Sequence, residues 1–509
     1  MPSKQVPRAV VALGIVSRAL ASLSAETMNE QVRAAAYAVR GPIVQRAALI
    51  EEQLKKGEKL PFSKTVACNI GNPQALMQKP LSFHRQVISL ILFPEALDDP
   101  EQRMRIPADV VERAERYRSS MPNVGAYTAS QGLPIVRQEV VDFISRRDGT
   151  PAGNPDNIFL TNGASDGVRM IYQCCIRAPR DGVRDGVLVP IPQYPLYSAL
   201  TTLYTGELVP YFLNEASGWT VTADDLREQL KEARKDGVDV RALVVINPGN
   251  PTGNTLPLPI MREIVDLCAK EGLVLLADEV YQSNIWDDSL PFHSFRSVAI
   301  EMGHTEDFNP TGKGLQLVSF HSCSKGFYGE CGLRGGYFEI FGIDPEVRAQ
   351  ISKLSSISLC SNTLGQLATG LLVRPPQEGE PSYAKYVSER DAILESMKRR
   401  AELLSESFNK IPGMSCQPIA GALYAFPSIE LPKAFVEEAE EQGKAPDAMY
   451  CMRLLEDTGI VCVPGSGFGQ VDGTHHFRTT ILPPEEEMPG VVASITQFHA
   501  GIWERYGEA

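Results

Sequence analysis

The sequence has few of the features that would place a protein in a membrane or on nucleic acid. Across its 509 residues no stretch approaches the ~18 consecutive apolar residues of a membrane-spanning helix, since Arg18 interrupts the most apolar N-terminal run. The formal net charge of −13 opposes non-specific attraction to nucleic acid and to anionic membrane surfaces. We therefore expect no membrane span and no nucleic-acid partner, so local donors must hold any anionic ligand.

Cysteine and histidine motifs are also missing. The ten cysteines include no CxxC pair, and the adjacent Cys174 and Cys175 cannot bridge readily without strain. The seven histidines are scattered along the chain. We interpret the cysteines as reduced thiols of a soluble intracellular protein, and we expect no metal site.

The N-terminal segment leaves the compartment open. Residues 1–25 contain Lys4, Arg8 and Arg18, several serines and alanines, and no acidic residue before Glu26. This composition is typical of a transit peptide, and an ordinary basic N-terminal arm is the alternative. We expect a cytoplasmic or mitochondrial protein.

Four short apolar runs predict the fold class. Between residues 155 and 345 they alternate with helical patterns, and they are VLVPI (187–191), LVVIN (243–247), LVLLA (273–277) and LVSFH (317–321). Continuous apolar runs of this length are typical of parallel strands covered on both faces. The sequence therefore predicts an α/β protein whose large domain is built on a mainly parallel sheet.

A proline-rich, acidic break near residues 375–381 divides the chain. Beyond it, residues 381–410 form the pattern of one long amphipathic helix, and shorter strand patterns follow. We expect an N-terminal arm or transit peptide, a large domain, and a smaller α+β domain assembled from two segments. Their expected ranges are 1–25 for the arm, 26–100 and 381–509 for the small domain, and 101–380 for the large domain.

Functional side chains follow each apolar run. In open parallel sheets ligands bind beyond the carboxyl ends of the strands, so these positions are the first candidates for a site. The candidates in chain order are Tyr194, Asn250, Asp278, Tyr281, Ser322, Ser324 and Lys325. Each is weak evidence alone, because an isolated lysine or an NPGNPTG segment is usually a solvated charge or a turn. Their joint order predicts that they converge on one crevice.

An aldehyde cofactor with a pyridine ring needs this set of groups. The amine of Lys325 can form a Schiff base and then act as a general base, while a carboxylate such as Asp278 keeps the pyridine nitrogen protonated. Asn250 and Tyr281 can donate to the phenolate oxygen, and the ring of Tyr194 can lie against the cofactor. The constellation therefore predicts pyridoxal 5'-phosphate.

A phosphate cup is expected next to these groups. The segment FLTNGASDGV predicts a helix that begins near Ala164 and Ser165, where backbone N–H groups and the helix dipole favour an anion. Ser322, Ser324 and Arg334 supply further donors.

At these residues the chain resembles the class I and II aminotransferases of the type I pyridoxal phosphate fold, and within them the alanine aminotransferase subfamily. The SFHSCSKGFYGECGLRGGY block with GAYTASQG is far more specific than NPTG alone. The matching segments are YAVRGPIV (37–44), IGNPQ (70–74), GAYTASQG (125–132), LTNGASDGV (160–168), PQYPLY (192–197), NPGNPTG (247–253), LADEVYQ (276–282), SFHSCSKGFYGECGLRGGY (319–337) and HFRTTIL (476–482).

The resemblance implies a large domain with a mainly parallel seven-stranded sheet, and a homodimer with shared active sites. It gives Lys325, Asp278, Tyr281, Asn250 and Tyr194 the cofactor roles described above. It also implies that Tyr127 reaches the partner's phosphate, and that Arg478 takes the substrate's α-carboxylate with Gly71 and Asn250 beside it.

The expected activity is a reversible ping-pong transfer of the amino group from L-alanine to 2-oxoglutarate, giving pyruvate and L-glutamate. A glutamate:glyoxylate or alanine:glyoxylate aminotransferase is the alternative, although the C-terminal RYGEA lacks the peroxisomal signal expected of the glutamate:glyoxylate relatives. A lyase or decarboxylase with the same cofactor is a second possibility. A transcription regulator would need an added basic DNA-binding domain, which neither the charge nor the N-terminus indicates.

Overall fold

A seven-stranded sheet forms the centre of the computed structural model, which describes residues 23–37 and 41–507. The strand order is β2-β8-β7-β6-β5-β3-β4. Strands β3, β4, β5, β6 and β7 are all parallel to one another, whereas β8 runs antiparallel to both of its neighbours, β2 and β7. The bounds are β2 (Ile158–Thr161), β3 (Arg184–Ile191), β4 (Glu207–Phe212), β5 (Val238–Ile246), β6 (Val274–Asp278), β7 (Gln316–Ser322) and β8 (Gly336–Phe341). The expected α/β fold with a mainly parallel seven-stranded sheet is confirmed.

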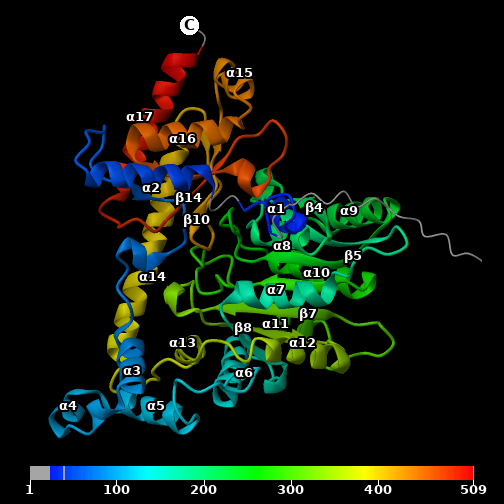
Figure 1. The fold of residues 1–509 in the computed structure, drawn as a ribbon, viewed down its shortest axis with the longest axis vertical. Coiled ribbons are helices and arrows are strands. Elements are labelled where there is room, and N and C mark those ends of the chain that lie inside the picture. Colours follow the sequence, from blue (N-terminus) through cyan, green and yellow to red (C-terminus); the bar gives the residue numbers. More distant parts are fainter. Residues whose placement is uncertain (1–22, 38–40, 508–509) are drawn as a thin grey trace, which may run out of the picture.

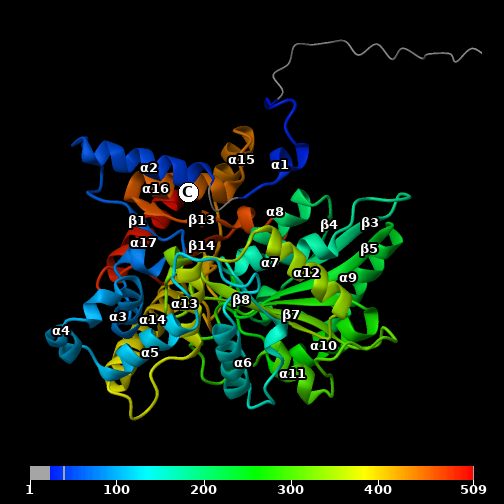
Figure 2. The same cartoon turned by 60° about the horizontal axis from the view of Figure 1, so that its bottom comes forward.

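Helices cover both faces of this sheet, as the apolar runs predict. Leu188 packs into a core with α9 (Ala223–Lys235), α10 (Leu258–Glu271) and α11 (Phe295–Glu301). Its neighbours Val187 and Val189 point to the other face, because side chains alternate along a strand. There they pack with α7 (Ala164–Cys175), α8 (Leu196–Leu203) and α12 (Pro345–Ile357). Figure 2 shows α7 and α12 on one side of the sheet and α10 and α11 on the other.

A second body lies beyond the carboxyl ends of the parallel strands (Figure 1). Its main sheet has the order β10-β14-β13 and is antiparallel. The bounds are α2 (Pro42–Lys55), β1 (Val66–Ala67), β9 (Met414–Ser415), β10 (Tyr424–Ala425), β11 (Ser428–Ile429), α15 (Lys433–Glu441), α16 (Pro446–Thr458), β12 (Ile460–Val461), β13 (Val463–Pro464), β14 (Phe477–Thr480) and α17 (Met488–Tyr506). One hydrophobic core joins β10, β14 and these helices.

The long helix α14 (Tyr383–Phe408) connects the two bodies, and its bounds agree with the predicted amphipathic helix. Tyr386 near its start packs with Leu81 and Tyr328, whereas Leu404 and Phe408 near its end belong to the core around β10. The helix therefore fixes one body relative to the other along its length (Figure 1).

The segment expected to belong to the small domain, residues 26–100, divides between two cores. Helix α2 and Cys68 pack with α14 and α16, but α3 (Ser82–Leu92) packs with α5 (Ala108–Ser119), α6 (Pro134–Asp148) and α13 (Thr363–Val373). The short α4 (Pro100–Arg105) joins α3 to α5. The expected boundary at residue 100 therefore falls inside one packed cluster. The division into domains remains a prediction, and we propose to place that boundary between β1 and α3.

The N-terminal region is described from residue 23, so most of the expected arm or transit peptide, residues 1–25, lies outside the described residues. Helix α1 (Glu30–Ala34) packs against α8. Within residues 23–37 and 41–507, no helix has the length and apolar character needed to cross a bilayer.

Candidate active site

A cavity of about 310 Å³ lies at the carboxyl ends of β5, β6 and β7. Apart from Tyr127, every residue expected at the site lines it. They are Gly71, Ala164, Ser165, Tyr194, Asn250, Asp278, Tyr281, Ser322, Ser324, Lys325, Arg334 and Arg478. Asn250, Asp278, Ser322 and Lys325 meet here because the carboxyl ends of parallel strands share one end of the sheet. Arg478 comes from β14 of the other body, so the cavity is closed from both sides.

Lys325 extends into this cavity from the turn that follows β7. Its Nζ donates a hydrogen bond to the Gly71 carbonyl at 3.3 Å, and it lies 5.7 Å from the centre of the Tyr281 ring. None of the ion pairs within the described residues involves Lys325. Its amine is therefore held by one weak contact and can attach an aldehyde without breaking an ion pair.

Asp278 is the last residue of β6 and is almost fully buried. One carboxylate oxygen accepts a 2.6 Å hydrogen bond from Tyr197 Oη, and the other accepts a 3.4 Å bond from the Val280 N–H. Burial raises the pKa of Asp278, while the Tyr197 bond and the charge of Lys325 act in the opposite direction. Because burial disfavours the charged carboxylate more than these two contacts favour it, a positively charged partner would stabilise it. A protonated ring nitrogen is such a partner, so Asp278 fits the pyridine end of pyridoxal phosphate.

A donor-rich corner surrounds the start of α7. The residue before the helix, Gly163, has a φ of 85° and offers no side-chain cap, so no capping side chain competes with an anion for the N–H groups of Ala164 and Ser165. The next N–H, that of Asp166, donates to the Gly163 carbonyl at 3.1 Å. A Cβ at Gly163 would lie 2.7 Å from Arg334 Nη2, which explains the need for glycine. Arg334 Nη1 is 3.4 Å from Ser324 Oγ, and the Ser324 N–H donates to Ser322 Oγ at 3.1 Å. This corner fits a phosphate group.

Arg478 is 1% exposed. It donates to Asn250 Oδ1 at 3.1 Å and to the Asn69 carbonyl, while its Nε has no hydrogen-bond partner among the described residues. Its guanidinium carbon lies 4.3 Å from the centre of the Tyr424 ring and 4.7 Å from that of Phe468. No described ion pair neutralises it. A buried guanidinium without a carboxylate fits a site that takes its carboxylate from a ligand.

Three tyrosines at the site were not predicted. Tyr197 bonds Asp278, Tyr424 accepts a 3.0 Å hydrogen bond from Tyr281 Oη, and Tyr37 Oη is 2.5 Å from Tyr194 Oη. Tyr37, Tyr194 and Tyr424 line the cavity. Tyr197 lies in PQYPLY and Tyr37 in YAVRGPIV, two of the matching segments, so the sequence could have drawn attention to both, whereas Tyr424 lies in none of those segments.

Tyr127 lies outside this cavity, in the loop between α5 and α6, with its side chain 76% exposed. Within one chain it reaches none of the groups expected at the phosphate corner. Its predicted role across a dimer interface remains a prediction.

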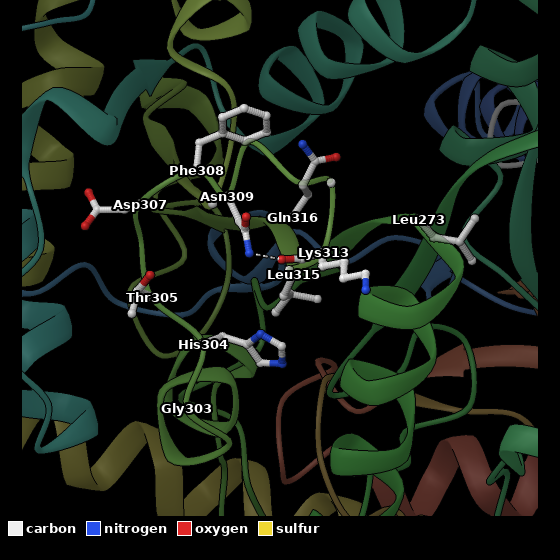
Figure 3. A pocket seen from close by; sticks show the side chains of 14 residues that line it. Leu273, Gly303, His304, Thr305, Asp307, Phe308, Asn309, Lys313, Leu315 and Gln316 are labelled. Carbon is white, nitrogen blue, oxygen red and sulfur yellow. Dashed lines mark hydrogen bonds between the residues drawn. The ribbon is translucent and has the colours of Figure 1, made fainter.

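A second, larger cavity lies at the opposite edge of the sheet. It measures about 410 Å³ and is lined mainly by the loop between α11 and β7, with His304, Asn309 and Lys313 among its side chains (Figure 3). No residue of the predicted constellation lines it. Size alone therefore does not identify the chemical site.

Comparisons with known proteins agree with this geometry. The family model described as aminotransferase class I and II matches residues 95–495. Alanine aminotransferase from Pyrococcus furiosus has the same fold, with a TM-score of 0.71 and 24% identity over 93% of this chain and 100% of that one. An aminotransferase from Escherichia coli gives a TM-score of 0.69 and 24% identity, covering 93% of this chain and 98% of that one.

Sequence relatives are more similar. The chain is 49% identical to alanine aminotransferase 2 of Panicum miliaceum over 489 residues, 96% of this chain and 99% of that protein. It is 51% identical to the probable mitochondrial alanine aminotransferase of Dictyostelium discoideum over 492 residues, covering 95% and 90%. It is 48% identical to glutamate–glyoxylate aminotransferase 2 of Arabidopsis thaliana over 490 residues, covering 96% and 98%.

Fold and site together define an aminotransferase of the pyridoxal phosphate type. The chain belongs to the class I and II aminotransferase family. It is a pyridoxal phosphate-dependent transaminase, and its substrates are an amino acid and an oxo acid. The predicted family, enzyme class and cofactor are confirmed.

Proposed function

We propose that this enzyme moves the amino group of L-alanine to 2-oxoglutarate, giving pyruvate and L-glutamate in a reversible ping-pong reaction. The observation that carries the proposal is the buried guanidinium of Arg478, which has no acidic partner within residues 23–37 and 41–507 and shares a cavity with Lys325 and Asp278. Both substrates carry an α-carboxylate that this group can bind. The relatives named alanine aminotransferase, at 49% and 51% identity, favour alanine as the amino donor.

When bound, pyridoxal phosphate supplies an aldehyde for the amino group and a ring that accepts the electrons of the Cα–H bond. Lys325 Nζ would hold the cofactor, and its amine, once free, would take the proton from the substrate Cα and deliver it to the cofactor's aldehyde carbon. The Asp278 carboxylate would keep the ring nitrogen protonated, and its burial would make that pairing stronger than it would be in water. Asn250 and Tyr281 would donate to the phenolate oxygen, with the Tyr194 ring against the cofactor.

The remaining cavity residues would bind and orient. Ala164, Ser165, Ser322, Ser324 and Arg334 would hold the phosphate through backbone and side-chain donors.

Gly71 would shape the substrate end. A Cβ at that position would lie 2.3 Å from Tyr424 Oη and 3.3 Å from Lys325 Nζ, so any larger residue would crowd the reacting amine. Together with Asn250, which accepts a hydrogen bond from Arg478, the Gly71 backbone would help to place the substrate's carboxylate.

Glutamate:glyoxylate or alanine:glyoxylate transfer is the alternative, since the Arabidopsis glutamate–glyoxylate aminotransferase 2 is 48% identical. The test is a steady-state panel of alanine, glutamate and aspartate against pyruvate, glyoxylate and 2-oxoglutarate. The proposal expects the highest kcat/KM for the pair alanine and 2-oxoglutarate and for its reverse. A preference for glyoxylate over 2-oxoglutarate would replace it with the alternative.

We infer further that the enzyme works as a homodimer in which Tyr127 reaches the partner's phosphate corner. Its 76% exposure and its position outside the cavity of its own chain support this inference. In a dimer with two-fold symmetry, each subunit would supply its Tyr127 to the site of the other. The name of the Dictyostelium relative supports a mitochondrial location, with the transit peptide in residues 1–25.

A further inference from the structure

Tyr424 occupies a position between the two bodies that the predicted chemistry does not use. It begins β10, and its backbone pairs with Thr480 of the neighbouring strand β14. Arg478 lies two residues earlier on β14, so its side chain points to the same face as that of Thr480. The pairing therefore brings the Tyr424 ring under the guanidinium of Arg478, at 4.3 Å from ring centre to Cζ.

The hydroxyl of Tyr424 makes a separate contact at the other end of the ring. Tyr281 Oη donates to it at 3.0 Å, and the two rings meet edge to face. Gly71 packs directly against this hydroxyl, since a Cβ there would come within 2.3 Å of it. One fully buried side chain thus contacts the residue expected to donate to the cofactor's phenolate oxygen and the residue expected to bind the substrate's carboxylate.

We propose that Tyr424 is a positioning residue that sets the Tyr281 hydroxyl through its own hydroxyl and the Arg478 guanidinium through its ring face. The inference rests on the proposed function, because it takes the roles of Tyr281 and Arg478 from there. The new element is that two different parts of the Tyr424 side chain act on two different residues. The hydroxyl affects the cofactor, and the ring affects the affinity for carboxylate.

Several charged and titratable groups face this pair from the surrounding elements. They are Asp278 at the end of β6, Lys325 after β7, Cys331 in the turn of η6 (Cys331–Leu333), Tyr194 after β3 and Arg478 on β14. Burial favours the neutral form of Tyr424, but the charges of Lys325 and Arg478 outweigh it and bring the pKa of Tyr424 below its ordinary value. Burial and the neighbouring Tyr424 hold the pKa of Tyr281 well above its ordinary value. Tyr281 is therefore the donor of the pair and Tyr424 the acceptor.

The test separates hydroxyl from ring in the holoenzyme. Two quantities are measured: the pH midpoint of the visible absorbance of the bound cofactor, and the Kd of propionate, which has a carboxylate but no amino group. Tyr424→Phe removes the acceptor of the Tyr281 proton, so Tyr281 can donate fully to the phenolate oxygen. We expect the midpoint to fall by about one pH unit, the effect of one hydrogen bond, with no change in the Kd of propionate.

Tyr424→Leu removes the ring as well. It should lower the midpoint like the phenylalanine variant and also raise the Kd of propionate by about 2- to 30-fold, as expected for a cation–π contact. Phe468→Leu is the matched control, because the Phe468 ring also lies against Arg478, at 4.7 Å, but packs with Phe426 and Val463 instead of Tyr281. It should raise the Kd of propionate and leave the midpoint unchanged.

Two results would overturn the inference: a midpoint that stays or rises in Tyr424→Phe, or a Kd that changes equally in the phenylalanine and leucine variants. Either would mean that Tyr424 only fills space. If the wild-type enzyme transfers the amino group of alanine and Tyr424→Phe has the wild-type pH midpoint, the proposed function stands and only this inference fails. Failure of the wild type to use alanine would instead remove the proposed substrate without affecting these two binding measurements.

Discussion

Replacing Arg478 with lysine should weaken amino acid and oxo acid together. The guanidinium is 1% exposed, donates to Asn250 and Asn69, and has an Nε that no other residue of the described part of the chain contacts by a hydrogen bond. Lysine keeps the charge but cannot offer two parallel donors to a carboxylate. Loss of one charge-assisted hydrogen bond costs about 1.5–3 kcal/mol, which corresponds to about 10- to 150-fold in apparent affinity. We expect the KM values for alanine and 2-oxoglutarate to rise by similar factors within this range.

The assay is steady-state kinetics in which each substrate is varied at a fixed concentration of the other. Arg400→Lys is the control, since Arg400 is also buried and donates to the backbone carbonyls of Ser396, Leu482 and Pro483, away from the cavity. It should leave both KM values unchanged even where it lowers stability. A rise confined to one substrate in Arg478→Lys would refute the reasoning, because the group would then recognise a side chain and not the shared carboxylate.

Three further predictions concern the cofactor lysine, the dimer and a buried carboxyl group. Borohydride reduction followed by peptide mass spectrometry should find the pyridoxyl group on Lys325, and Lys325→Ala should lose both the reduced adduct and turnover; an adduct on another lysine with turnover retained would contradict this. Mixing refolded Lys325→Ala and Tyr127→Ala subunits should restore about a quarter of wild-type activity by random pairing, whereas activity no higher than the parents' average would exclude the shared site. Burial raises the pKa of Glu279 from 4.5 to about 8, so the folded form keeps a proton that the unfolded chain releases, and the free energy of unfolding should fall as pH rises between these values. Glu279→Gln should lose this dependence in chemical denaturation at several pH values, and an unchanged slope would contradict it.

The parts of the site that the sequence predicts are those set by local pattern. Asp278 ends an apolar run, and Lys325 follows another by a few residues, so the parallel topology alone brings them to one edge. The amphipathic pattern likewise predicts α14 almost to its ends, because its apolar stripe must meet a core.

The parts that escape prediction depend on contacts between distant segments. Tyr424 reaches Arg478 through the pairing of β10 with β14, two strands too short to give a periodic signal. Tyr37 meets Tyr194 across 157 positions of sequence. Helix α3 has the same amphipathic pattern whether it packs against one body or the other, so its place beside α5 and α13 follows only from the tertiary arrangement.

The central claim is that this enzyme takes the amino group from alanine, keeps it, and passes it to 2-oxoglutarate. The most direct measurement gives the holoenzyme ¹⁵N-labelled L-alanine alone, quantifies pyruvate, removes small molecules, and then adds 2-oxoglutarate. We expect pyruvate equal to the number of active sites in the first step and an equal amount of ¹⁵N-glutamate in the second. Release of carbon dioxide or ammonia from alanine, or the absence of label in glutamate, would contradict the claim.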